Sequence, residues 1–435
     1  MRKKRNAFTL IELLAVIVIL AVILVIAIPR ILDVIETSKK DSFKNAAQLI
    51  ADSAEKKKAS NKLLDKDEEI TCKDVAKIND EDYASCIISF DENGNAKVSI
   101  TGKGKFDGLK ITNGTKENAE VKEITKPTYG MKATEYITNL LEYDGEGLKI
   151  DNTKDQNIRY YGSDPNNYVR FNNELWRIIG VFGNNVKLVR SESLGNLSWD
   201  SSANNVNYGS GINQWGESTH EDGSYYEGAD LQVYLNKMYY GGDTTVTCYG
   251  DSGNKTTTCP TNTLDETSKS LIDNYTWNVG AIEEEDTRTD TLAFYNAERG
   301  IINGKVCSYS MYCTDTVTRT TIWTGYIGLP YVTDWAYASE NSICETNMQT
   351  KDSSNAFICK SNNWMHNSGD TRYISPRANF TDATPTYFVS SDGYVWGRNA
   401  SSAISVFPAI YLKSNVLIES GNGTSDSPYI LKAGV

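Results

Sequence analysis

Ala7-Phe8-Thr9-Leu10-Ile11-Glu12-Leu13-Leu14 joins a short basic leader to a long apolar segment. The leader contains four basic residues at positions 2–5, and an unbroken apolar run extends from Leu13 to Ile28. Phe8 to Ile28 is 21 residues, enough to span about 30 Å of hydrocarbon, and Glu12 stands near its head. Because a carboxylate in such a helix costs roughly 2.5–3.5 kcal/mol on insertion, we expect Glu12 to have a function.

This pattern resembles the processing and methylation site of type IV prepilins and pseudopilins. The resemblance implies that a membrane-bound prepilin peptidase removes residues 1–7, cutting after Ala7, and N-methylates Phe8. It also implies that Glu12 pairs with the N-terminal amine of a neighbouring pilin subunit during assembly. The family usually has glycine before the cut, and we expect Ala7, which is also small, to slow cleavage at most.

Two simpler explanations of this end of the chain are weaker. A secretory signal peptide needs a small-residue cleavage site after the apolar run, and Ala27-Ile28-Pro29-Arg30 does not provide one. A plain membrane anchor would show the same flank and length but gives no reason for Glu12. Since the basic leader stays in the cytoplasm, we expect one helix in the cytoplasmic membrane and the rest of the chain in a pilus or on the cell surface.

The composition excludes several classes of partner and site. The chain has 435 residues, enough for two or three domains. Its net charge is −12 and no basic stripe follows the leader, which argues against a nucleic-acid partner. With only two histidines, we expect no metal site and no cofactor.

All eight cysteines follow the apolar segment, and they fall into close neighbours along the chain. In a chain outside the cytoplasm this even number indicates a disulfide framework. Neighbour pairing is the simplest connectivity, although the sequence alone leaves others open. A zinc site would require C-x-x-C spacings, which are absent. The expected pairs are Cys72/Cys86, Cys248/Cys259, Cys307/Cys313 and Cys344/Cys359.

Residues 8–63 are predicted to form the pilin helix, with residues 8–28 in the membrane or the filament core. Apolar residues continue at intervals of three and four as far as Ala54, the period of an amphipathic helix. Pro29 should kink this helix because it removes a backbone donor and crowds the preceding turn. A proline near this point is also what the resemblance implies.

Residues 64–115 are predicted to form a small antiparallel sheet, as in a pilin head. Strands at 86–90 and 96–101 flank Asp91-Glu92-Asn93-Gly94-Asn95, a turn sequence, and 108–112 is a third strand. The turn has some features of a calcium loop but lacks its glycine spacing and terminal glutamate, so we favour a plain turn. Residues 116–143 read as a linker with a short helix at 134–141.

Residues 144–435 form a third zone of different character, which contains all eight tryptophans. Strands 175–182 and 186–190 flank Gly183-Asn184-Asn185, a hairpin turn, and short strands recur towards the end of the chain. We expect a large, loop-rich, β-dominated domain stabilised by disulfides. The whole chain is therefore predicted to be α+β, with a long N-terminal helix on a small sheet followed by this domain.

The third zone resembles a domain found at the ends of surface proteins of gut Firmicutes. The resemblance lies in an opening phrase at residues 168–180 and a closing phrase at residues 408–413. More distantly, it is similar to the C-type-lectin-like and formylglycine-generating folds. The oxidising cysteines of the formylglycine enzymes have no counterpart here, so no catalytic residue is carried over.

Aromatic and Asn-rich loops suit sugar binding, because an aromatic face stacks on a pyranose ring and amides bond its hydroxyls. Trp176 and Trp323 lie in apolar strands and are expected in the core. His220 and His366 lack a nucleophile motif nearby, so we expect no enzyme. The candidate ligand-binding residues are Trp199, Trp215, Trp335, Trp364 and Trp396, together with Tyr225 and Tyr226.

Three functions remain open on the sequence. The first is a minor pilin or pseudopilin whose large domain serves adhesion or binds glycans. The second is a purely structural subunit of a pilus, competence or type II secretion-like fibre, and the third is a pilin-tethered surface enzyme. The size of the third zone favours the first, because a large appendage crowds the repeat of a helical fibre and suits a low-copy position.

Overall fold

The computed structural model describes residues 10–66, 68–76, 81–143, 145–201, 215–219, 225–253, 259–280, 282–283, 291–302, 305–306, 321–346, 358–378 and 385–434. These residues form two compact units. The first ends at Lys126 and includes Glu142 and Tyr143, and the second comprises Pro127–Leu141 and the chain from Gly145 onward.

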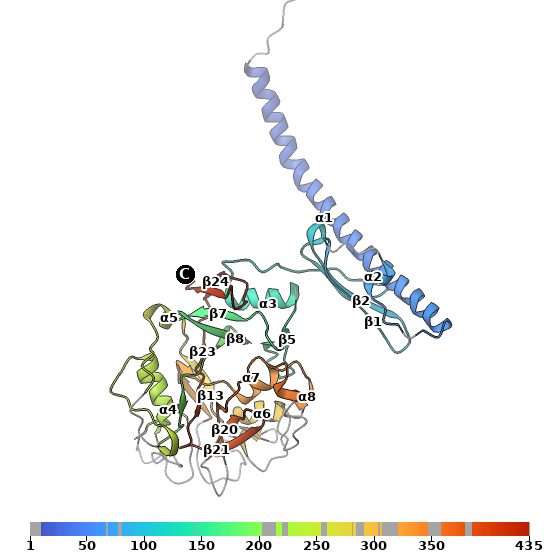
Figure 1. Ribbon diagram of the computed structural model, residues 1–435. Coiled ribbons are helices and arrows are strands. Elements are labelled where there is room, and N and C mark those ends of the chain that lie inside the picture. The colour runs from blue at the N-terminus through green and yellow to red at the C-terminus, as the bar shows by residue number, and fades with distance from the viewer. Residues whose placement is uncertain are drawn as a thin grey trace, which may run out of the picture. The chain divides into compact units, whose positions relative to one another are not determined.

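Helix α1 (Leu10–Leu63) is one continuous element that contains Pro29 (Figure 1). From Leu10 to Ile35 the large apolar side chains that the structure describes are exposed, and the most apolar stretch of the helix has a mean hydropathy of 3.0. Such a long apolar surface is not stable in water, and its length and composition suit a membrane span. The predicted long helix is confirmed, while the kink at Pro29 stays a prediction.

The second half of α1 packs on the first unit's sheet. Its buried apolar residues are Phe43, Ala47, Ile50, Ala51 and Ala54, which recur at intervals of three and four and so share one face. Strands β1 (Tyr83–Phe90), β2 (Ala96–Gly102), β3 (Leu109–Gly114) and β4 (Lys122–Glu123) are antiparallel in the order β1-β2-β3-β4. The 3₁₀ turn η1 (Gly104–Phe106) joins β2 to β3, and helix α2 (Cys72–Val75) precedes β1.

The predicted hairpin of the first unit is confirmed. Phe90 pairs with Ala96 across the turn, and the Asp91 carboxylate accepts hydrogen bonds from the backbone N–H groups of Asn93 and Asn95 at 3.0 and 2.8 Å. The carboxylate thus closes the turn on its own backbone. The segment expected as a linker contains β4, in the first unit's sheet, and α3 (Ala133–Tyr143), whose Ala133, Tyr136 and Ile137 are buried in the second unit's core.

The second unit has two main sheets among its described residues. The larger has the order β18-β23-β9-β8-β7-β25-β24, with β6 on β8 and β5 on β6. Its strands are β5 (Leu148–Ile150), β6 (Ile158–Tyr160), β7 (Tyr168–Phe171), β8 (Glu174–Phe182), β9 (Asn185–Arg190), β18 (Ile327–Gly328), β23 (Ala409–Tyr411), β24 (Leu417–Ser420) and β25 (Tyr429–Lys432). Strand β9 pairs with both β8 and β23, so it lies between the opening phrase (β7 and β8) and the closing phrase (β23) in one sheet.

The second sheet has the order β10-β22-β19-β20-β21, with β14 on β19. Its strands are β10 (Asn196–Leu197), β14 (Ile282–Glu283), β19 (Thr371–Ala378), β20 (Pro385–Val389), β21 (Val395–Asn399) and β22 (Ile404–Ser405). Three two-stranded pairs join β11 (Ser218–Thr219) to β12 (Tyr225–Tyr226), β13 (Tyr275–Asn278) to β17 (Ile322–Gly325), and β15 (Ile301–Ile302) to β16 (Lys305–Val306).

Short helices fill the connections of the second unit. They are α4 (Asp230–Val233), the π-helix η3 (Tyr234–Tyr240), η4 (Asp251–Gly253), α5 (Glu266–Leu271), α6 (Thr291–Glu298), α7 (Val332–Tyr337) and α8 (Ile343–Thr346). The predicted hairpin at 175–190 is present as β8 and β9, and Gly183 supplies a positive φ of 57° in its tight turn. The α+β prediction is confirmed, because helices and mostly antiparallel sheets alternate without a regular βαβ repeat.

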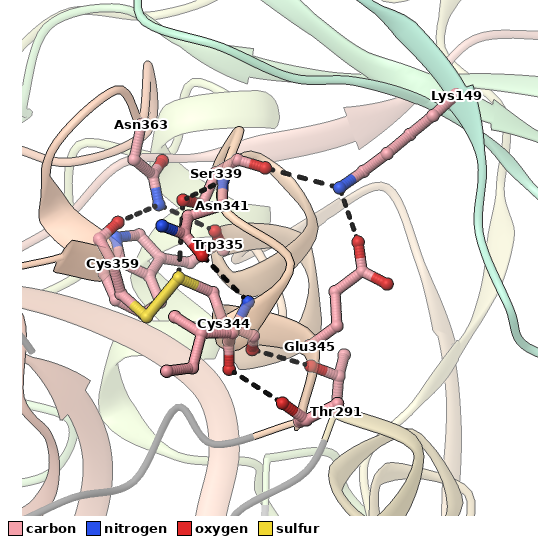
Figure 2. The surroundings of a disulfide bond; sticks show 11 residues. Lys149, Thr291, Trp335, Ser339, Asn341, Cys344, Glu345, Cys359 and Asn363 are labelled. Carbon is pink, nitrogen blue, oxygen red and sulfur yellow. Dashed lines mark hydrogen bonds and ion pairs between the residues drawn. A yellow bond between two sulfur atoms is a disulfide. The ribbon is translucent and has the colours of Figure 1, made fainter. Parts of the chain in front are cut away.

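Three of the expected disulfides are present: Cys72–Cys86, Cys248–Cys259 and Cys344–Cys359. Cys307 and Cys313 lie outside the described residues. Figure 2 shows that Cys344–Cys359 lies beside Trp335, and Asn363 Nδ2 donates to the carbonyl oxygens of Trp335 and Cys359 at 2.9 and 3.2 Å. The bond closes a sequence separation of 15 residues, which in the chain-entropy model stabilises the unit by about 3 kcal/mol.

Candidate functional site

The N-terminal site residues lie at the edge of the described chain. Ala7 and Phe8, the expected processing positions, fall outside it. Glu12 lies near the start of α1, although its side chain is not among those described. Pro29 lies inside the exposed apolar half of the same helix. The roles of these four residues therefore rest on the sequence.

Trp199 and Trp215 do not present a face to a ligand, which corrects the sequence prediction. Both are fully buried, with ring centroids 4.9 Å apart, and Trp215 meets Trp323 edge to face at 6.1 Å. The three indoles pack against one another in a row in the core. Large aromatic side chains that are buried in this way contribute strongly to the stability of a core, so these indoles stabilise the second unit.

Trp335 is also fully buried, beside the Cys344–Cys359 disulfide (Figure 2), so its prediction as a ligand residue is wrong for the same reason. Trp364 is 9% exposed and lines a cavity of about 40 Å³. A water needs roughly 10–15 Å³ on this measure, so the cavity holds a few waters and no sugar ring. The side chains of Trp396, Tyr225 and Tyr226 lie outside the described residues, whereas Trp176 and Trp323 are buried as expected.

A much larger cleft lies in the second unit, between the α4–η3 segment and the β17 strand. Its volume is about 460 Å³. We call it the Tyr240–Tyr326 cleft, after the two rings that stack in its lining with centroids 4.1 Å apart and planes 10° from parallel. It is lined by Glu217, Glu227, Gly228, Gln232, Val233, Asn236, Lys237, Tyr240, Asn274, Trp323, Thr324, Gly325 and Tyr326.

The π-helix η3 positions one wall of the Tyr240–Tyr326 cleft. Its wide turn is closed by the Gly241 N–H, which donates to the Asn236 carbonyl at 3.2 Å. The Asn236 side chain accepts from the Ile327 N–H at 3.0 Å and donates to the Ile327 carbonyl at 2.9 Å. This paired contact holds Tyr326 next to Tyr240. Single π turns are rare and recur at functional sites, where they re-aim side chains.

Trp323 and Glu217 form another part of the cleft lining. The Trp323 indole Nε1 donates to Glu217 Oε2 at 3.1 Å, which fixes the carboxylate at the cleft. A Cβ on Gly216 would lie 2.2 Å from Trp323 Cδ1, and one on Gly325 would lie 2.1 Å from Trp323 Cη2. Both glycines are therefore required so that the backbone can approach the indole this closely.

The cleft combines aromatic rings with hydroxyl, amide and carboxylate groups. Burial raises the pKa of Tyr240 to about 12. Its hydroxyl, like that of any tyrosine at neutral pH, can donate a hydrogen bond. Thr324 and Asn274 are exposed, and Glu227 lies 3.5 Å from Lys237 Nζ. Aromatic surface beside a few polar groups is the usual make-up of a small-molecule site. No local pattern in the sequence predicts this set of residues, because its members come from segments far apart in the chain.

A second cluster of charged residues lies in the core of the same unit. Asp334 Oδ2 accepts from Lys187 Nζ at 2.6 Å, and its Oδ1 accepts from Arg159 Nη1 at 2.5 Å. Arg159 Nε donates to Asp151 Oδ2 at 2.8 Å. None of these four residues is more than 4% exposed. Two cations and two carboxylates make a neutral group, and its burial leaves no access for a substrate.

The charges within this cluster stabilise one another. Burial would raise the pKa of Asp334, but Lys187 and Arg159 together hold it below its ordinary value. Burial lowers the pKa of Lys187 to about 8, although Asp334 opposes that change. Lys187 Nζ also lies 3.8 Å from the centroid of the Tyr331 ring. The ionised carboxylate is therefore what keeps the buried ammonium charged.

Glu298 lies in the same core and is expected to make the stability of the unit depend on pH. It is fully buried and accepts from the Thr333 hydroxyl at 2.9 Å, and burial raises its pKa from 4.5 to about 7 although Arg299 opposes this. The folded protein therefore keeps a proton that the unfolded chain releases above pH 4.5. Between that pH and about 7, stability falls by on the order of 3 kcal/mol from this group alone.

The Glu298→Gln variant tests this dependence, because the amide imitates the protonated acid. We expect it to match the unchanged protein near pH 4.5 and to be more stable above pH 7, by on the order of 3 kcal/mol. Denaturant titrations of both proteins at several pH values measure the difference directly. Parallel stability curves across this range would contradict the raised pKa of Glu298.

His366 lies between a backbone carbonyl and an aromatic ring. Its Nε2 is 3.1 Å from the Ser391 carbonyl oxygen, and burial lowers its pKa. Its ring meets Trp335 edge to face, with centroids 6.4 Å apart. His220 lies outside the described residues. Within the described part of the chain, no group of three or more His, Cys, Asp or Glu residues is arranged to hold a metal ion.

Comparison with known proteins identifies the N-terminal segment. Residues 2–28 match the model of the prokaryotic N-terminal methylation motif. The match supports a type IV pilin-like N-terminus. Searches of curated proteins and of solved structures give no match. The resemblance of the second unit to surface proteins of gut Firmicutes thus stays a prediction.

Proposed function

We propose that this chain is a minor pilin or pseudopilin that displays a glycan-binding domain for adhesion. The observation that carries the proposal is the Tyr240–Tyr326 cleft, which lies in a large unit carried by a pilin-like stem. At about 460 Å³, the cleft is within the range of small-ligand sites. Stacked aromatic rings beside carboxylates and amides suit the alternating apolar and hydroxylated faces of a sugar.

The stem supports the assembly part of the proposal. The N-terminal methylation motif at residues 2–28 implies processing by a prepilin peptidase and assembly with other pilins. The exposed apolar half of α1 then lies in the cytoplasmic membrane before assembly and against other pilin helices afterwards. Display at the cell surface follows, and the large second unit suits a low-copy subunit.

We infer that the cleft binds and does not catalyse. A glycosidase needs one carboxylic acid kept protonated by an apolar environment beside a second, ionised carboxylate. Glu217 and Glu227 are instead both exposed, one bonded to the Trp323 indole and the other close to Lys237. This arrangement presents two exposed carboxyl groups as hydrogen-bond acceptors, which suits recognition of hydroxyl groups.

The test is binding of the full chain, kept in detergent micelles, to a broad array of glycans and mucins. We expect saturable binding to a defined sugar, which Tyr326→Ala weakens by about 2 kcal/mol, roughly thirtyfold in Kd, because aromatic anchors dominate such sites. Tyr129→Ala is the matched control, since Tyr129 is 58% exposed in the same unit and does not line the cleft.

Three results would overturn the proposal. Absence of binding to every glycan would favour the second candidate, a structural subunit of a pilus, competence or type II secretion-like fibre. Binding that Tyr326→Ala leaves unchanged would place the ligand outside the Tyr240–Tyr326 cleft. Turnover of a bound oligosaccharide would instead support a pilin-tethered enzyme.

A further inference from the structure

We propose that the Tyr240–Tyr326 cleft selects neutral and amine-bearing sugars and rejects glycans that carry sialic acid, sulfate or phosphate. This inference rests on the proposed function and adds the chemical class of the ligand. It follows from the charges at the cleft and from the direction of the hydrogen bonds that those charges can make.

The charge of the cleft lining is negative. Among its lining residues, Glu217 and Glu227 contribute two negative charges and Lys237 one positive charge, which leaves −1. The whole chain carries −12, so the wider field has the same sign. An anionic sugar is repelled by the charge of the lining and by that of the whole chain. A neutral sugar meets no such repulsion, and a protonated amine is attracted.

The positions of the two carboxylates make this repulsion local. Glu217 cannot turn away freely, because its Oε2 holds the Trp323 indole N–H at 3.1 Å. Glu227 is only loosely neutralised, since it lies 3.5 Å from Lys237 Nζ and both side chains are more than half exposed. The attraction within an exposed ion pair of this kind is weak and is screened by salt. The cleft therefore keeps carboxylate oxygens that are open to a ligand.

Hydrogen-bond direction favours the same class of ligand. An ionised carboxylate only accepts hydrogen bonds. Sugar hydroxyls and a protonated amine donate, so they match Glu217 and Glu227. A sialic acid carboxylate or a sulfate group only accepts, so it would leave these oxygens unpaired on losing water, which costs free energy. The Lys237 ammonium is the single lining group with a positive charge, and Glu227 already faces it.

The experiment compares matched oligosaccharides on the full chain in detergent micelles at low salt. Lactose is paired with sialyllactose, and N-acetylglucosamine oligomers with their deacetylated, amine-bearing counterparts and with sulfated ones. We expect each anionic form to bind roughly tenfold more weakly than its neutral partner, with a smaller difference at high salt. The amine-bearing form should bind at least as well as the acetylated one.

The Glu217→Gln/Glu227→Gln double variant changes the lining charge from −1 to +1 and keeps one acceptor oxygen on each side chain. We expect this variant to bind neutral and anionic glycans equally well or to prefer the anionic ones. Its tryptophan fluorescence should match that of the unchanged protein, which shows that the fold is kept. Equal or tighter binding of anionic glycans by the unchanged protein would overturn this inference and leave the proposed function standing. Failure to bind any oligosaccharide of the set or of the broader array would overturn both.

Discussion

The Glu12→Ala variant is expected to reach the membrane and to be cut before Phe8, yet to be nearly absent from assembled fibres. We propose, from the resemblance to type IV pilins, that this carboxylate pairs with the N-terminal amine of a neighbouring subunit. Without it, each incoming ammonium group would enter an apolar environment unpaired, at a cost of roughly 2.5–3.5 kcal/mol. That cost corresponds to a fall of more than about fiftyfold in incorporation.

Quantitative immunoblots of sheared fibres and of membranes measure this prediction. Glu36→Ala is the matched control, because Glu36 is a carboxylate on the same helix that pairs only with Lys40, at 3.1 Å, among the described residues. Its fibre content should stay within about twofold, as expected for loss of an exposed pair. Normal fibre content for Glu12→Ala would show that Glu12 has no part in assembly.

The first unit could be predicted from local sequence signals. Apolar spacing along α1 identified the helix and its buried face, and the Asn- and Gly-rich turn identified the hairpin of β1 and β2. Each signal comes from residues close together in the chain. The short strand β4 was missed because two residues, Lys122–Glu123, carry no alternation of apolar and polar side chains.

The cleft could not be predicted in this way, and the reason is physical. Residue type alone does not separate a core indole from a ligand-binding one, and Trp199, Trp215 and Trp335 proved to be core. The rings that line the cleft, Tyr240 and Tyr326, are brought together by a π turn and by the Asn236 contact to Ile327. Such long-range placement leaves no periodic signal in the sequence.

The buried charge cluster was also invisible in the sequence, since its members lie at positions 151, 159, 187 and 334. Its existence changes how the second unit is held together. Buried ion pairs add little net stability over apolar residues, but removal of one partner leaves an uncompensated charge. Asp334 is the central member, because it bonds both Lys187 and Arg159. The cluster should therefore be most sensitive at this residue.

The Asp334→Asn variant is expected to lower the free energy of unfolding of the second unit by about 3–5 kcal/mol. The amide keeps the shape of the side chain but leaves the charges of Lys187 and Arg159 facing a neutral group. Denaturant titration of the full chain in detergent measures the loss by tryptophan fluorescence. All eight tryptophans follow residue 175, so the signal reports on the second unit alone.

Two further variants show whether buried charge is the cause. Asp164→Asn removes a carboxylate that is 65% exposed and pairs with Arg177 at 3.0 Å, and it should cost less than about 1 kcal/mol. Lys187→Met combined with Asp334→Asn removes one charge of each sign and leaves Arg159 paired with Asp151, so it should recover part of the loss. The Lys187→Met and Asp334→Asn single variants are measured beside the double variant. If the stability loss of the double variant equals or exceeds the sum of these two single losses, then lost packing, and not an unpaired charge, destabilises the Asp334→Asn protein.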